Sequence, residues 1–226
     1  MPQIRLEQVS HRYGEREVLR GLDLVLTEAR IGVVGANGSG KSTLARMLNG
    51  LVVPTAGRVL VDGLDTRRDG GRIRRRVGFV FTDPDAQIVM PTVAEDVAFS
   101  LRRRGLSRTE LAERVRQALA AVGLEGHADH PAHYLSGGQK QLLAITSILV
   151  TEPDVLVCDE PTTLLDARNS RQVRDLLAGL PQQVIVVTHQ LELVAGFDRV
   201  IVIDDGTVAG DDSPGPALAL YRRLVG

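Results

Sequence analysis

The segment Gly35–Thr43, with the sequence GANGSGKST, has the residue types and spacing of a loop that binds phosphate. It follows the short apolar run Ile31–Val34, and we expect a helix from about Lys41 to Leu51 directly after it. Glycines let successive backbone N–H groups turn inward around phosphate oxygens, and the N-terminus of a helix adds partial positive charge. The segment therefore predicts a nucleotide-binding loop rather than an ordinary glycine turn.

Two side chains of this loop have distinct expected roles. Lys41 is expected to reach the β- and γ-phosphates of the nucleotide, and the Ser42 hydroxyl is expected to bind Mg²⁺. Only two of the 27 basic residues are lysines, Lys41 and Lys140, and one of them lies here. The other nucleotide-binding residues that the motif predicts are Gly35, Asn37, Gly38, Ser39, Gly40 and Thr43.

Two acidic residues, Asp159 and Glu160, follow the apolar run Val155–Cys158. The C-terminal ends of buried parallel strands form the ligand edge of a sheet. Asp159 is therefore expected to coordinate Mg²⁺, directly or through water, and Glu160 to orient and deprotonate an attacking water. Such a pair on its own is more often a solvated turn, but the phosphate loop in the same chain favours the catalytic interpretation.

A second anion site is predicted at Leu135–Gln139, with the sequence LSGGQ, where two glycines begin a helix that Ser136 caps. A phosphate loop and a second anion site in one chain suggest a nucleotide that two chains share. With these motifs, nearly the whole sequence resembles the ATPase subunit of ABC transporters.

This resemblance implies that two ATPase chains enclose two ATP molecules head to tail. The phosphate loop of one chain then faces the LSGGQ segment of the other. Its residues Ser136, Gly137, Gly138 and Gln139 form the second half of the nucleotide site, and the first three touch the γ-phosphate. A homodimer is the simplest arrangement, and a heterodimer with a related ATPase is the alternative.

Three more positions match the family. Tyr13 matches the aromatic residue that stacks on adenine. The alternative is that Tyr13 is an ordinary residue of an edge strand. Asp166, at the end of the Leu164–Asp166 loop, matches the segment that crosses the dimer interface. His189, after the apolar run 184–187, matches the histidine that senses the γ-phosphate.

One position departs from the family. A glutamine usually follows the strand expected at Val77–Phe81, where it reaches the metal and the membrane partner, but here that position is Thr82. Threonine is too short for this role without a bridging water, and Gln87 lies five residues later.

The segments 83–87 and 91–99 resemble energy-coupling factor ATPases, which drive uptake of vitamins or of cobalt and nickel. The implied partners are a shared transmembrane coupling protein and a small membrane-embedded substrate binder. Gln87 and its helix are then expected to help receive the coupling helices, although an ordinary capped helix near Thr92 is the alternative. The short chain and its threonine loop look most like the biotin-uptake branch, with cobalt or nickel as the alternative.

The composition argues against several other classes of protein. The chain has 226 residues, 43% of them hydrophobic, and is expected to form one ATPase domain over 1–226. Its 27 basic and 28 acidic residues give a net charge of −1, so no nucleic-acid partner is expected. The arginine clusters 72–76 and 102–104 are interpreted as solvated faces, with contact to anionic lipid as the alternative.

The sequence also indicates a cellular location. A single cysteine, Cys158, excludes an intramolecular disulfide and fits a reducing compartment. No apolar run approaches the roughly 18 residues that span a bilayer, and the first residues lack the hydrophobic core of a signal peptide. The chain is therefore expected to be soluble and cytosolic, and the resemblance to ABC ATPase subunits implies a peripheral position at the cytoplasmic face of the cell membrane.

The pattern of elements predicts an α/β fold. Alternating runs at Ile4–Ser10 and Leu22–Leu26 indicate an N-terminal antiparallel part. Later apolar runs alternate with helical segments, which indicates a mainly parallel sheet covered on both faces. A helical subdomain at about 92–150 is expected to interrupt this sheet, and Ser107–Glu110 has the pattern of a helix-capping box.

Four further histidines, His11, His127, His130 and His133, are expected at the surface or in loops. The last three are close enough in sequence to suggest a metal site, but no cysteine or acidic ligand set completes one.

Two other functional classes compete with transport. Non-transport ABC proteins of translation or DNA repair usually join two ATPase domains or carry coiled coils or zinc motifs, and none is visible here. A regulatory module without hydrolysis is disfavoured because Glu160 and His189 are both present.

Overall fold

The computed structural model describes all residues from 1 to 226, which form two compact units. The first unit contains residues 1–79, 154–160 and 177–226, and the second contains residues 80–153 and 161–176. The predicted helical segment 92–150 lies within the second unit.

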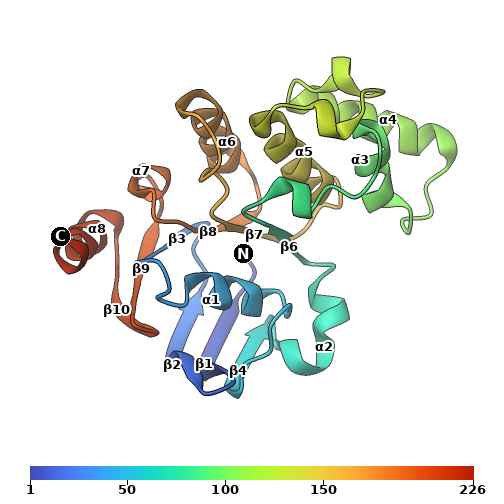
Figure 1. Ribbon diagram of the computed structural model, residues 1–226. Coiled ribbons are helices and arrows are strands. Elements are labelled where there is room, and N and C mark those ends of the chain that lie inside the picture. The colour runs from blue at the N-terminus through green and yellow to red at the C-terminus, as the bar shows by residue number, and fades with distance from the viewer. The chain divides into compact units, whose positions relative to one another are not determined.

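The first unit begins with an antiparallel sheet in the strand order β2-β1-β4-β5 (Figure 1). Its strands are β1 Ile4–Tyr13, β2 Arg16–Leu26, β4 Ala56–Val61 and β5 Leu64–Asp65. The predicted antiparallel part is therefore confirmed, with longer strands than the alternating runs alone indicated.

A bulge in β1 changes which side chains face the core. Ile4 and Leu6 point inward, Gln8 has a left-handed φ of 48°, and the inward positions after it are Val9 and His11. One extra residue in a strand reverses the alternation that follows it. The expectation that His11 lies at the surface or in a loop was therefore wrong, because the bulge buries its ring to 6% exposure.

The second sheet has six strands in the order β10-β9-β3-β8-β7-β6. These are β3 Arg30–Val34, β6 Val77–Val80, β7 Val155–Asp159, β8 Gln183–Val187, β9 Arg199–Asp204 and β10 Thr207–Asp212. The pairs β3–β8, β3–β9 and β7–β8 are parallel, and β10 pairs with β9 as an antiparallel edge strand. The predicted α/β class with a mainly parallel sheet is confirmed.

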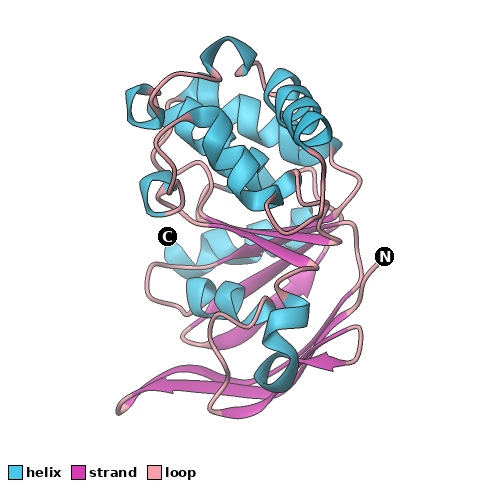
Figure 2. Cartoon of the chain, turned by 90° about the vertical axis from the view of Figure 1, so that its right-hand side faces the viewer, coloured by secondary structure: helices cyan, strands magenta, loops and turns pink.

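Helix α1 (Lys41–Leu48) packs between the two sheets of the first unit, as Figure 2 shows, and contacts strands of both. The unit also contains α2 Thr66–Ile73, α7 Leu191–Val194 and α8 Pro214–Val225. Of these, α2 and α8 were not predicted, and β10 was not predicted either.

The second unit is mainly helical. Its helices are α3 Val93–Leu101, α4 Arg108–Ala121, α5 Gly137–Leu149 and most of α6 Ala167–Gly179, with short 3₁₀ turns η1 Pro84–Ala86, η2 Glu125–His127 and η3 Ala132–Tyr134. Capping boxes begin α3, α4 and α5, and the one predicted at Ser107 is confirmed. Such caps satisfy backbone N–H groups that a helix leaves without an internal partner.

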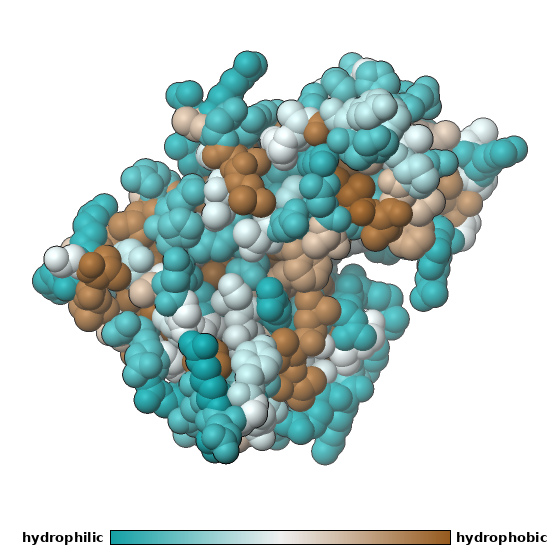
Figure 3. Space-filling view, viewed as in Figure 1, coloured by the Kyte–Doolittle hydropathy of each residue, from teal (hydrophilic) through white to brown (hydrophobic).

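No helix combines the length and the apolar character that crossing a bilayer requires. On the face drawn in Figure 3, apolar residues form small patches among hydrophilic ones.

Alanine substitutions at Gly57 and Gly63 test the packing around the β1 bulge. A Cβ at this residue would lie 2.2 Å from the backbone oxygen of Gln8 and 2.4 Å from that of Glu7. Gly63 has a similar φ of +79°, but nothing lies within 4 Å of an added Cβ. Both Gly57→Ala and Gly63→Ala force alanine into a left-handed backbone, which costs about 1–2 kcal/mol. Steric overlap adds about 1–3 kcal/mol at Gly57 alone.

Denaturant unfolding measures the difference between the two variants. Equal losses in their free energy of unfolding would show that the bulge does not require the close backbone contact.

Candidate functional site

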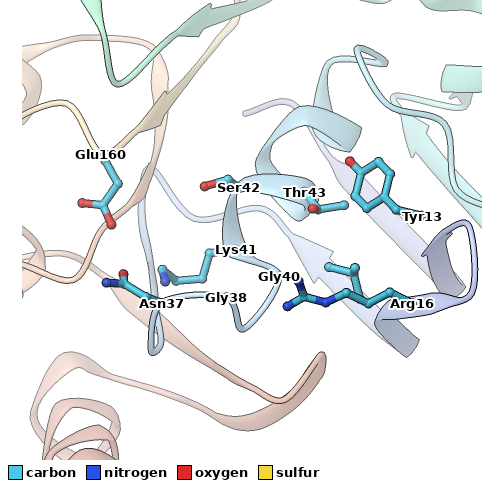
Figure 4. A pocket seen from close by; sticks show the side chains of 10 residues that line it. Tyr13, Arg16, Asn37, Gly38, Gly40, Lys41, Ser42, Thr43 and Glu160 are labelled. Carbon is cyan, nitrogen blue, oxygen red and sulfur yellow. The ribbon is translucent and has the colours of Figure 1, made fainter.

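A pocket of about 400 Å³ in the first unit is built around the phosphate loop. Figure 4 shows Tyr13 and Arg16 on one side of it and Glu160 on the other, with Lys41 and Ser42 between them. The lining residues are Tyr13, Arg16, Val18, Asn37, Gly38, Gly40, Lys41, Ser42, Thr43 and Glu160. Arg16 and Val18 were missed by the sequence analysis, because nothing in the pattern of β2 marks a residue of this pocket.

The loop itself is packed against backbone. A Cβ at Gly35 would lie 2.1 Å from the carbonyl oxygen of Ile203, and one at Gly40 would lie 2.7 Å from the carbonyl oxygen of Val18. Gly40 also has a φ of +103°, which other residues rarely adopt. Both glycines are therefore required by the first unit itself, before any ligand is considered.

Lys41 is buried inside this loop at 5% exposure, and its Nζ donates to the Ala36 carbonyl oxygen at 2.8 Å. Burial lowers the pKa of Lys41 below its ordinary value, while the nearby Glu160 and Asp159 act in the opposite direction. The ammonium is thus held among acceptors, at the first residue of α1.

Asp159 ends β7 with its carboxylate buried. Ser42 Oγ donates to Asp159 Oδ1 at 2.8 Å, and Arg46 Nη2 lies 3.7 Å from Oδ2. Burial raises the pKa of Asp159, and the hydrogen bond from Ser42 and the charge of Arg46 oppose that shift. A hydroxyl and a carboxylate side by side are the oxygen donors that Mg²⁺ prefers, so these two residues fit that ion.

Glu160 occupies the turn directly after β7, where its φ of 53° is left-handed. Its backbone N–H donates to the Val187 carbonyl oxygen at 2.8 Å, which ties this turn to the end of β8. A non-glycine residue held in this backbone region often marks a functional site. The strand ends thus place Glu160 at the edge of the sheet that also holds the phosphate loop.

Two residues after β8 hold the Glu160 carboxylate. His189 Nδ1 lies 2.9 Å from Oε1, while Thr188 Oγ1 donates to Oε2 at 3.2 Å. The structure brings Glu160 and His189 together, as their predicted roles require. Thr188 was missed, because a threonine beside the histidine carries no distinguishing sequence signal.

In the second unit, the LSGGQ segment forms a closed turn at the start of α5. Ser136 Oγ accepts from the Gln139 N–H at 3.4 Å, and the Ser136 N–H donates to Gln139 Oε1 at 2.9 Å. Gly137 is exposed, and a Cβ there would meet only the Leu164 carbonyl oxygen, at 3.9 Å. This turn leaves room for a ligand at its exposed glycine.

Gly138 is constrained differently. A Cβ there would lie 2.2 Å from Asn169 Cγ, so the contact with Asn169 requires a glycine. Asn169 is also tied to Asp166: its N–H donates to Oδ1 at 2.8 Å and its Nδ2 to Oδ2 at 3.1 Å. Asp166 therefore caps α6 and positions the residue that packs on the LSGGQ turn. Asn169 was missed, because its contact spans about thirty residues of sequence.

Gln87 is not part of the helix that begins after Thr92. It ends η1, its Oε1 accepts from the Phe81 N–H at 3.1 Å, and its Nε2 donates to the Ala144 carbonyl oxygen at 2.9 Å. Gln87 therefore caps η1, and the capped helix α3 that begins after Thr92 is a separate element. Both ends of the amide brace the second unit internally.

The predicted site residues fall into two groups. Tyr13, the phosphate loop, both acids and His189 lie in the first unit, and the LSGGQ segment and Asp166 lie in the second. Each group is assembled locally by its own unit.

Comparison with known proteins identifies relatives of the whole chain. Residues 20–163 match the family model described as "ABC transporter". The chain is 48% identical to the biotin transport ATP-binding protein BioM of Rhizobium etli, over 98% of this chain and 99% of the relative. It is 44% identical to the energy-coupling factor transporter ATP-binding protein EcfA1 of Symbiobacterium thermophilum, over 99% of this chain and 83% of the relative.

A solved structure has the same fold. The cbiO1 protein of Clostridium perfringens, described as part of the ABC transporter complex cbiONQ, superposes with a TM-score of 0.84 at 33% identity. The match covers 98% of this chain and 93% of the other.

The buried ammonium of Lys41 generates a prediction about nucleotide affinity. Lys41→Ala removes one charged donor, which corresponds to about a 10- to 100-fold loss of ATP affinity. Isothermal titration calorimetry measures the change. The control is Arg58→Ala, which removes an exposed cation that pairs with Glu7 outside the pocket. Unchanged affinity in Lys41→Ala would refute the role of this lysine.

Proposed function

The chain belongs to the ABC transporter family and is an ATPase, and from that premise we propose that it powers biotin uptake through an energy-coupling factor importer. The observation that carries the catalytic part is the geometry around Glu160, whose carboxylate is held at the edge of the phosphate-loop pocket by His189 and Thr188. The relatives named above support the transport part.

Nucleotide binding is assigned to the first unit. Tyr13 is about half exposed and lines the pocket, so its ring offers a face on which adenine stacks. The phosphate loop surrounds the phosphates with backbone N–H groups, and Lys41 supplies the positive charge. Ser42 and Asp159 would hold Mg²⁺, which would supply positive charge to neutralise the β- and γ-phosphates.

Hydrolysis is assigned to the acid after Asp159. Glu160 accepts a proton from the attacking water, because its carboxylate borders the pocket and is only 13% exposed. His189 and Thr188 restrict the orientation of that carboxylate, and the His189 side chain, 44% exposed, can also contact the γ-phosphate. Positioning and electrostatics of this kind supply most of the catalysis in phosphoryl transfer.

The second unit supplies the other half of the nucleotide site to a partner chain. The first N–H groups of α5 have no partner within the helix, so the turn from Ser136 to Gly138 presents donors and a helix N-terminus to an anion. Gln139 closes this turn and Asp166 positions Asn169 against it. Two copies arranged head to tail, each giving its LSGGQ turn to the other, complete two sites.

We assign the contact with the membrane partner to the segment between η1 and α3. A hollow of about 310 Å³ is lined by Asp85, Ile88, Val89, Met90, Pro91, Ala132 and His133. Val89 in this hollow is 62% exposed. Asp96 Oδ1 accepts from the Val89 and Met90 N–H groups, and Ser147 donates to its other oxygen. A fixed, partly apolar hollow suits a coupling helix of a transmembrane protein, and such contact would make the chain a peripheral protein at the cytoplasmic face of the membrane.

Biotin is favoured as the substrate because a relative that matches nearly the full length at 48% identity is named for biotin transport. Cobalt or nickel is the second candidate, because the energy-coupling factor ATPases that segments 83–87 and 91–99 resemble also drive uptake of these metals. An ATPase subunit of this kind does not itself bind the transported substrate, so a membrane-embedded binder determines it.

Affinity purification of the tagged chain from detergent-solubilised membranes of its host tests the transport proposal. We expect a transmembrane coupling protein and a small integral binder, and we expect the reconstituted complex to take up labelled biotin when ATP is supplied. Uptake of cobalt or nickel instead would refute biotin. Recovery of ribosomal or DNA-repair proteins without a membrane partner would refute transport.

The catalytic assignment predicts the behaviour of Glu160→Gln. Glutamine keeps the shape of the side chain but cannot accept the proton, so hydrolysis falls by about 10²- to 10⁴-fold. ATP binding persists, and the variant accumulates as an ATP-bound dimer in light scattering. The control is Glu192→Gln, at an exposed acid on α7 outside the pocket. Normal turnover in Glu160→Gln would remove Glu160 as the base.

A further inference from the structure

The Gln139 side chain is held from two sides at the start of α5. Its Oε1 accepts a hydrogen bond from the Ser136 N–H at 2.9 Å. Its Nε2 lies 3.2 Å from Nε2 of His127, a half-buried residue at the end of η2. The second contact joins the LSGGQ turn to a segment that no predicted motif includes.

The chemistry of these groups determines the direction of both hydrogen bonds. The backbone N–H of Ser136 can only donate, so the Gln139 oxygen must face it and the Gln139 NH₂ group must face His127. An NH₂ group can only donate, so His127 Nε2 must accept. A neutral imidazole accepts at one nitrogen and carries its proton on the other, which places the proton of His127 on Nδ1.

Gln139 supplies the hydrogen-bond contact of the His127 ring, because the other ring nitrogen, Nδ1, is buried and has no hydrogen-bond partner. The ring packs edge to face on that of His130, with centroids 5.1 Å apart. The His127 backbone N–H donates to the Leu124 carbonyl oxygen at 2.9 Å, which fixes the turn that carries the ring. With a second proton, His127 Nε2 would carry an N–H that points at the NH₂ group of Gln139, so two hydrogen-bond donors would face each other.

We infer that His127 is a positioning residue for nucleotide hydrolysis, which acts by accepting a hydrogen bond from Gln139 and so holds the LSGGQ turn closed. The inference rests on the proposed role of that turn in binding the γ-phosphate on a partner chain. Without the acceptor, the Gln139 amide can rotate, and the bond from Ser136 is lost with it. The N–H donors at Gly137 and Gly138 are then held less firmly, by the Ser136 Oγ cap and the contact of Gly138 with Asn169 alone.

Two substitutions of His127 separate the loss of the hydrogen-bond acceptor from the loss of side-chain packing. His127→Gln places an amide oxygen near the position of Nε2 and keeps the acceptor. His127→Leu keeps a side chain of similar size without any acceptor. His130→Leu is the control on the same segment, because it removes the neighbouring exposed ring and leaves His127 in place.

ATP hydrolysis is measured for each variant with Glu160 intact. ATP-dependent dimerisation is measured for each variant combined with Glu160→Gln, which stabilises the dimer. In His127→Leu we expect kcat/KM to fall about 3- to 10-fold, the loss that corresponds to one hydrogen bond. His127→Gln and His130→Leu should stay near the parent. ATP affinity at a protein concentration that keeps the chain monomeric should not change in any of them, because the pocket belongs to the first unit.

Imidazole ¹⁵N NMR of the ligand-free chain provides a second readout that does not depend on activity. The expected signature is a His127 ring protonated at Nδ1 with an accepting Nε2. A proton on Nε2, or equal losses in His127→Gln and His127→Leu, would overturn the inference. A wild-type chain that neither hydrolyses ATP nor dimerises would refute the proposed function instead, and the NMR result would still decide the hydrogen bond.

Discussion

The structure depends on close backbone packing around the phosphate loop. At Gly35 the loop approaches the Ile203 carbonyl oxygen so closely that no Cβ fits, and at Gly40 it approaches β2 in the same way. The Gly206 N–H also donates to the Ser39 carbonyl oxygen. These contacts fix the first residue of α1, and thereby the positions of Lys41 and Ser42. Parallel pairing of β3, β8 and β7 then brings Asp159, the last residue of β7, and the following Glu160 to the same edge of the sheet.

In the proposed function, each unit supplies only part of a nucleotide site. The first unit holds the proposed base Glu160 and the buried Lys41 ammonium at one pocket, and Ser42 of that pocket donates to Asp159, its proposed partner in binding Mg²⁺. The second holds a helix N-terminus whose Ser136 and Gln139 bond each other, supported by His127 and Asn169. In the proposed dimer, joining two such halves from different copies would couple ATP binding to association, because the γ-phosphate would contact both. Hydrolysis would remove that shared contact, and this coupling would give the ATPase a mechanical output.

The local parts of this account were predictable from sequence. The glycine loop before Lys41 and the capping box at Ser107 depend on residues within a few positions of each other. A helix begins at Lys41 as expected, and the capping box is confirmed. The burial of His11 was not predictable, because a single left-handed residue, Gln8, reverses the alternation of β1. The contacts of His127 with Gln139 and of Asn169 with Gly138 join segments distant in sequence. No local pattern marks such pairs, and only the packing of the second unit reveals them.

In the proposed dimer, the phosphate loop of one copy and the LSGGQ turn of another copy form one site. Mixing two inactive variants tests whether the site is shared. Lys41→Ala damages the phosphate loop, and Gly137→Asp sets a negative charge in the turn at an exposed position with room for a side chain. Random pairing makes half of the dimers mixed, each with one complete site, so about a quarter of wild-type ATP hydrolysis should return. A mixture as inactive as its components would contradict the shared site.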